Sequence, residues 1–110
     1  MIQKIMTISF SGKMAHAAAA PDWGRSAFDA LLLTISAVER FRKHLPAGVS
    51  TSYTILSAGN MPCNVVPDNA QGCFNLEAGS EEELAFAASR MRLIAESAVM
   101  MTGTSVKITE

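Results

Sequence analysis

The sequence predicts an α+β domain of the ferredoxin-like class: a βαββαβ sandwich whose four-stranded antiparallel sheet carries two helices on one face. Three observations support this class. Strand-like and helix-like segments alternate in that order, both helical segments have an apolar stripe, and 110 residues suffice for one modest core. We therefore expect residues 1–110 to form a single domain.

The first half of the chain is expected to form a strand, a loop and a helix. Residues 4–11 alternate between apolar and polar types, as in a half-buried strand. One face of this strand carries Met6, Ile8 and Phe10. A loop follows over residues 12–24, and residues 26–44 predict a helix that Pro46 and Gly48 end. Its apolar residues recur every three or four positions: Phe28, Leu31, Leu32, Ile35, Val38 and Phe41.

Two further strands are expected in the middle of the chain. Residues 49–57 are rich in β-branched and aromatic side chains, which favour a strand. Glycine, asparagine and proline make residues 58–64 a loop. Residues 69–78 then alternate again and predict the third strand.

The last part of the sequence predicts a capped helix and a short strand. Ser80 and Glu83 have the spacing of a capping box, in which the serine hydroxyl accepts from the Glu83 N–H and the carboxylate reaches back. The helix runs to about Met101. Its apolar stripe consists of Leu84, Ala88, Met91, Ala95 and Ala98. Val106 and Ile108 mark the fourth strand.

This topology places the first and last strands side by side and antiparallel. The start of the first strand and the end of the last then lie together, as required of a domain inserted into another. The abrupt ends of the sequence fit such an excised insert. Whether the chain is a fragment or a stand-alone protein stays open.

Composition limits the classes of partner. The net charge is −1, so no basic field favours nucleic acid, and no apolar run approaches the ~20 residues of a membrane span. The N-terminus lacks the apolar core of a signal peptide. Cys63 and Cys73 form no metal-binding pair, so we expect free thiols in a reducing cytoplasm; a disulfide between them stays open.

No complete catalytic set is present, so the chain by itself is not expected to be a self-sufficient enzyme. Of its two histidines, His44 lies at a helix end and His16 lies in a loop of small residues. His16 is either a loop histidine that caps the next helix or bonds a backbone carbonyl, or a hydrogen-bond donor to a ligand. Asn64 is either an Asx turn or a ligand contact, and Arg25 is either a carboxylate binder or an ordinary exposed arginine.

Two motifs together resemble one family. The stretch "FSGKMAHAAAAPDWGRSAFDALL", followed about fifty residues later by "NVVPD", is similar to the lid, or dimerisation, domain of the two-zinc peptidases and amidohydrolases. That family includes carboxypeptidase G, aminoacylase, succinyl-diaminopimelate desuccinylase and aminobenzoyl-glutamate hydrolase. The resemblance covers nearly the whole chain, and the alanine-rich histidine loop is most similar to the last of these enzymes.

The resemblance implies a function shared with a separate catalytic domain that is absent here. That domain holds two divalent metals, expected to be zinc, whereas this chain provides no metal ligand. The lids pair into a homodimer, and His16 matches the residue that stabilises the oxyanion in the partner subunit's active site. Asn64 matches a substrate contact, and Gly12 and Gly24 match loop-shaping glycines.

The implied reaction is hydrolysis of the amide bond of N-acyl amino acids or small peptides. One position departs from the family pattern: Glu77 falls near the place where many members have an arginine that binds a substrate carboxylate, and whether it replaces that arginine stays open. A glutamate there would repel a carboxylate. The sequence names neither the substrate nor the metal. The alternative of the same fold class is a stand-alone, ACT-like module that binds a small regulatory molecule.

Overall fold

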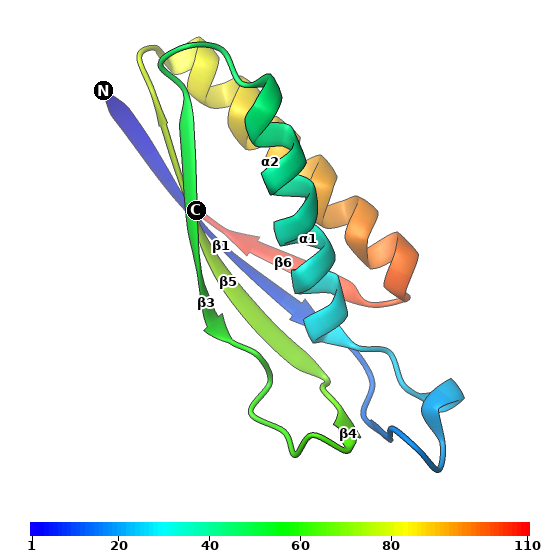
Figure 1. Ribbon diagram of the computed structural model, residues 1–110. Helices are drawn as coiled ribbons and strands as arrows, with labels where there is room; N and C mark the ends of the chain where they lie inside the picture. The colour runs from blue at the N-terminus through cyan, green and yellow to red at the C-terminus, as the bar shows by residue number, and fades with distance from the viewer.

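The ferredoxin-like prediction is confirmed. The computed structural model describes residues 1–110 and has one four-stranded antiparallel sheet with the strand order β3-β5-β1-β6. Helices α1 and α2 lie side by side over one face of this sheet (Figure 1). The elements are β1 (Ile2–Ser11), α1 (Ala27–Phe41), β3 (Ser50–Ser57), β5 (Asn69–Ala78), α2 (Glu81–Thr102) and β6 (Ser105–Thr109).

The expected loops contain a second, smaller sheet. In it, β2 (Ala15–His16) pairs antiparallel with β4 (Val65–Val66), and the 3₁₀ turn η1 (Pro21–Trp23) follows β2. The predicted helix over residues 26–44 ends earlier as an α-helix, because a 3₁₀ turn, η2 (Arg42–His44), forms its last part. Tightening of the last turn in this way is common at helix ends.

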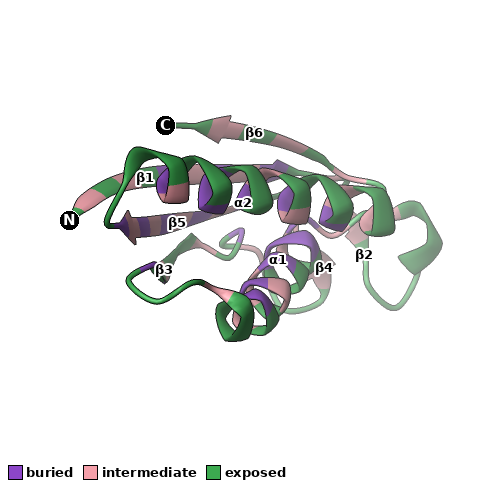
Figure 2. Cartoon of the chain, turned by 90° about the horizontal axis from the view of Figure 1, so that it is seen from above, coloured by how far each residue is buried: buried purple, intermediate pink, exposed green.

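The core lies between the sheet and the helices. Met6, Ile8 and Phe10 of β1 are at most 1 % exposed, which confirms the predicted face of this strand. The whole predicted stripe of α2 is buried as well, and the buried side of each helix faces the sheet (Figure 2). None of the helices is both long and apolar enough to cross a membrane.

The predicted stripe of α1 is wrong at Leu32. Its side chain is 43 % exposed, while Ala27 and Thr34 are buried instead. Thr34 satisfies its hydroxyl within the helix, because Oγ1 donates to the Ala30 carbonyl at 2.8 Å. Small and satisfied residues thus face the sheet, and Leu32 is left at the flank. Glu39, two turns further along the same face, pairs with Arg42, which also donates to the Thr51 carbonyl of β3, so this flank is the β3 side.

Both helices begin at serine caps. Ser26 Oγ accepts from the Asp29 N–H at 3.0 Å, and Ser80 Oγ accepts from the Glu83 N–H at 3.2 Å. The Ser80 hydroxyl also donates to the Glu83 carboxylate at 3.2 Å, so the second bond of the capping box joins the two side chains. Gly103 ends α2 with φ of 69°, the left-handed conformation that glycine adopts without strain.

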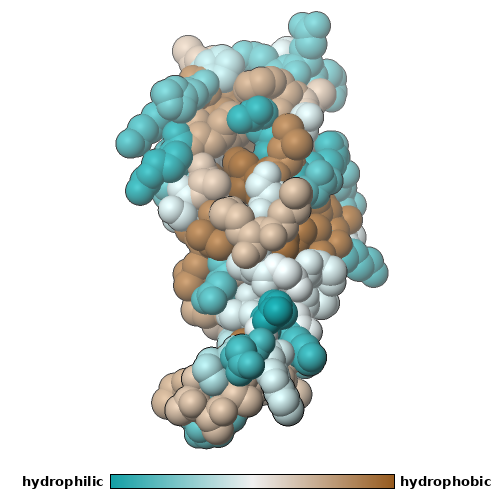
Figure 3. Space-filling view, turned by 90° about the vertical axis from the view of Figure 1, so that its right-hand side faces the viewer, coloured by the Kyte–Doolittle hydropathy of each residue, from teal (hydrophilic) through white to brown (hydrophobic).

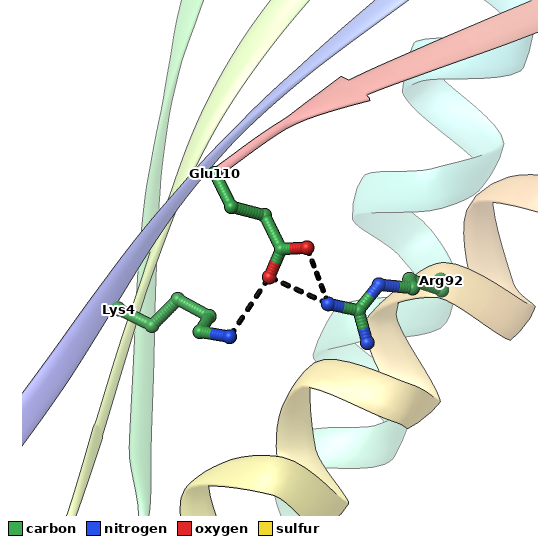
Figure 4. A network of polar contacts seen from close by, with 3 residues as sticks. All are labelled: Lys4, Arg92 and Glu110. Atoms are coloured by element: carbon green, nitrogen blue, oxygen red, sulfur yellow. Dashed lines mark hydrogen bonds and ion pairs between the residues drawn. The ribbon is translucent and has the colours of Figure 1, made fainter.

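The end of the chain is anchored beside β1, as the topology predicts. β6 pairs with β1 from Ser11↔Ser105 to Thr7↔Thr109. Beyond this ladder, the Glu110 carboxylate forms ion pairs with Arg92 of α2 and with Lys4 of β1, the latter at 2.9 Å (Figure 4). Arg92 first, and then Lys4, lower the pKa of Glu110 below its ordinary value of 4.5.

Replacing Glu110 by Gln is expected to change the acid sensitivity of folding. A carboxyl group whose pKa is lowered in the folded state stabilises the protein at pH values above its ordinary pKa. This contribution disappears as the pH falls through the lowered pKa. The variant should therefore melt roughly 2 °C below the wild type at pH 7, as for an exposed ion-pair network. The gap should close in strong acid. Glu96→Gln, which removes an unpaired glutamate of α2, is the control for thermal melting; an equal shift there would contradict the assignment.

Candidate functional site

The structure brings His16 and Asn64 together at one end of the molecule. His16 of β2 is paired with Val65 of β4, directly after Asn64 in the sequence. The Ala17 N–H also donates to the Asn64 carbonyl at 2.8 Å. Both side chains are exposed. The β2–β4 pair extends past the end of the main sheet (Figure 1), so the two residues lie on a small platform outside the core.

The His16 ring is fixed by its own loop. Nδ1 accepts hydrogen bonds from the N–H groups of Ala18, at 3.2 Å, and Ala19, at 3.0 Å. A ring nitrogen that accepts carries no proton, so the neutral imidazole carries its proton on Nε2. His16 therefore caps its own loop, whereas the sequence suggested a cap of the next helix or a bond to a carbonyl, and Nε2 stays available as the outward donor. Capping and donation to a ligand are compatible because they use different nitrogens.

Gly12 and Gly24 lie where the loop comes close to neighbouring backbone and side chains. A Cβ atom on Gly12 would lie 2.0 Å from the Arg25 carbonyl oxygen, and one on Gly24 would lie 3.0 Å from the Val66 side chain. Lys13 and Arg25, each directly after one of these glycines, exchange backbone hydrogen bonds of 2.8 and 2.9 Å. These bonds hold the two ends of the loop together. The close approach of backbone at Gly12 and of the Val66 side chain at Gly24 favours residues without a side chain.

The Arg25 side chain is used within the loop. Its Nη1 donates to the carbonyls of Asp22, at 3.1 Å, and Gly24, at 2.6 Å, and so closes the η1 turn. This favours the ordinary structural interpretation of Arg25 over carboxylate binding. Trp23, in the same turn, is 68 % exposed and was not singled out from the sequence. The sequence did mark this residue, because it is the chain's one tryptophan and lies in a loop of small residues.

Glu77 is not close to His16 within the chain. In the sheet register Glu77 pairs with Gln3, whereas Asn69, at the loop end of β5, pairs with Ser11. Glu77 lies eight residues along β5 from Asn69, a distance of about 27 Å. Glu77 instead accepts from the Asn75 side-chain amide at 3.2 Å. Any role of Glu77 beside His16 would therefore need a second chain or domain.

The chain's own acids, cysteines and histidines do not fit a metal site. No group of three or more such side chains gathers in the structure. Cys63 and Cys73 are both free, the first exposed and the second half-buried on β5. None of the four cavities is lined by His16 or Asn64.

Fold and site together define a small α+β domain that presents a rigid histidine at the end of its sheet. The sequence profile of one such domain, the peptidase dimerisation domain, matches residues 4–99. The chain belongs to this family.

Individual relatives agree with this assignment. The chain is 33 % identical over 98 residues to a subunit of the p-aminobenzoyl-glutamate hydrolase of Escherichia coli strain K12, an alignment covering 89 % of the chain and 20 % of that protein. The chain thus spans a fifth of the length of its curated relative.

Solved structures share the fold at low identity. An aminobenzoyl-glutamate utilization protein from Klebsiella pneumoniae superposes with a TM-score of 0.84 at 20 % identity, over 96 % of this chain and 27 % of that one. An amidase of the hydantoinase/carbamoylase family from Burkholderia ambifaria superposes with a TM-score of 0.88 at 15 % identity, over 96 % and 26 %.

Proposed function

We propose that this chain is the lid and dimerisation domain of a zinc-dependent amidohydrolase or peptidase, and that it supplies His16 in trans to the active site of the partner subunit. The observation that carries the proposal is the hydrogen bonding of the exposed His16 ring: Nδ1 accepts from two N–H groups of its own loop, which leaves Nε2 for a ligand. The substrates proposed are N-acyl amino acids or small peptides. The name of the Escherichia coli relative supports an amide bond next to an amino acid.

The chemistry expected of His16 is stabilisation of negative charge. Amide hydrolysis passes through a tetrahedral intermediate whose oxygen becomes an anion, and a preplaced donor lowers its energy. A neutral imidazole with its proton on Nε2 is such a donor. In this proposal the exposed Asn64 amide, beside the same platform, orients the substrate, while Gly12 and Gly24 keep the loop narrow.

The two divalent metals belong, in this proposal, to a catalytic domain in the remainder of the parent enzyme. The residues present here do not fit a metal, so no step of the reaction is assigned to one within this chain. The cytoplasmic location also stays a proposal, supported by two cysteines that form no disulfide.

The proposed homodimer forms through the free edge of β3. This strand has eight residues, Ser50–Ser57, none of them charged, and only β5 pairs with it. The other edge strand, β6, is shorter and carries Lys107. A long, uncharged edge pairs readily with another strand, whereas a lysine discourages pairing. Ile55 and Leu32, 45 % and 43 % exposed, would lie beside such a contact.

Sedimentation equilibrium of the purified chain tests the self-association. We expect a dimer at tens of micromolar, because a two-fold β3–β3 contact extends the sheet and covers apolar side chains. A strict monomer under these conditions would argue against dimerisation through this domain. Thermal melting with added amino acids runs in parallel, since a concentration-dependent rise in melting temperature would favour the ACT-like alternative.

A further inference from the structure

A long groove runs along the seam between α1 and α2, on the side of the helices that faces away from the sheet. Two adjoining cavities of about 540 and 350 Å³ form it, and they share Ala37, Arg90 and Ile94. We call this feature the seam groove. It lies on different elements from the His16 loop and from the edge of β3.

Apolar side chains form most of the seam groove, and several of them are exposed. Leu33 of α1 is 38 % exposed, and Phe86, Leu93 and Met101 of α2 are 46 %, 50 % and 67 % exposed. Figure 3 shows apolar side chains gathered over the helical part of the surface, with polar groups around them. A contiguous apolar patch of this kind is typical of a protein-binding surface.

One end of the seam groove is basic. Arg40 and His44 line it there, Arg90 lies where the two cavities adjoin, and no acidic residue lines either cavity. Neither Arg40 nor Arg90 forms an ion pair, although Arg42 and Arg92, close by in the sequence, do. The Arg90 guanidinium lies 5.9 Å from the centre of the Phe41 ring, which places its charge over the groove. The basic end therefore favours a ligand with carboxylates.

The dimensions favour a helix over a small molecule. Phe86 and Met101 are fifteen residues apart on α2, which is about 22 Å along the helix, or four turns. A four-turn amphipathic helix places a row of apolar side chains in such a groove through positions i, i+3, i+4 and i+7.

We propose that the seam groove binds an acidic amphipathic helix of a partner polypeptide, with apolar residues along the groove and carboxylates at Arg40 and Arg90. A second copy of this chain does not fit. No acidic residue lines either cavity, so the groove of a second copy would offer Arg40 and Arg90 no carboxylate.

Fluorescence anisotropy on the 110-residue chain tests the proposal. The probes are two labelled peptides of about 18 residues, each with leucines on one helical face. One carries a pair of glutamates in its first turn, and the other carries lysines there. We expect the glutamate peptide to bind at least tenfold more tightly. The double variant Arg40→Glu/Arg90→Glu should reverse this preference.

A matched control separates the groove from general charge. The double variant Lys43→Glu/Lys107→Glu makes the same change in net charge at residues that line neither cavity, and it should keep the wild-type preference. Circular dichroism verifies that both variants fold. Equal binding of the two peptides, or an equal effect of the two double variants, would overturn the proposal. The proposal would also be overturned if the Arg40→Glu/Arg90→Glu variant were monomeric where the wild type is a dimer, since a second copy would then occupy the groove.

Discussion

Replacing His16 by Ala in the complete enzyme that carries this domain is expected to lower kcat by about 10²–10³-fold, the usual cost of one lost oxyanion donor. KM should change little, because the donor acts on charge that develops only in the transition state. Steady-state kinetics measures both constants. Gln at the same position should recover part of kcat, since its side-chain amide retains an N–H donor.

Mixed dimers distinguish action in trans from action in cis. One subunit carries His16→Ala with an intact catalytic domain, and the other carries an intact lid with an inactivated catalytic domain. If His16 crosses to the neighbour, the mixed dimer regains one working site, although each homodimer is inactive. Inactive mixed dimers would place His16 in its own subunit's site. An unchanged kcat in His16→Ala would remove the catalytic role altogether.

Replacing Ile55 by Lys is expected to weaken dimerisation by about 10²–10³-fold. A two-fold interface contains each substitution twice, and losing a well-packed apolar contact costs about 2 kcal/mol each time. The two new ammonium groups also add like charges to the interface. Each 1.4 kcal/mol corresponds to tenfold in affinity, which sets the expected range. Sedimentation equilibrium over a concentration series measures the dissociation constant.

Ile5→Lys is the matched control for this variant. Ile5 is as exposed as Ile55, at 48 % against 45 %, but it belongs to the central strand β1 and faces away from the helices. The wild-type dissociation constant is expected there. A dimer that survives Ile55→Lys but not Ile5→Lys would move the interface to the open face of the sheet. A dimer that survives both would exclude the β3 edge.

Local patterns predicted the main elements well because each element agrees with its surroundings. The 69–78 strand matches β5 residue for residue, since its alternation follows the pleat over its full length. The apolar stripe of α2 was also predicted correctly, because its small and apolar residues recur at helical spacing and all pack against one sheet. The order of these elements then leaves few right-handed topologies.

Prediction failed where the neighbours of a side chain decide its place. Leu32 fits the apolar period of α1 as well as Leu31 does, yet the orientation of the helix on the sheet leaves it at the β3 flank. The two-residue strands β2 and β4 lie about fifty residues apart and are too short to show a period. Their pairing depends on contacts between distant segments.

The candidate site shows the same division. The sequence by itself determined the fold class, the two motifs and the residues to examine, because these depend on local pattern and spacing. Only the tertiary structure decided that Asn64 lies beside His16, that the alanine loop holds Nδ1 and leaves Nε2–H outward, and that Glu77 lies at the far end of the sheet. The physical reason is that hydrogen-bond partners and the register of strands are properties of segments far apart in sequence, which meet only in the folded chain.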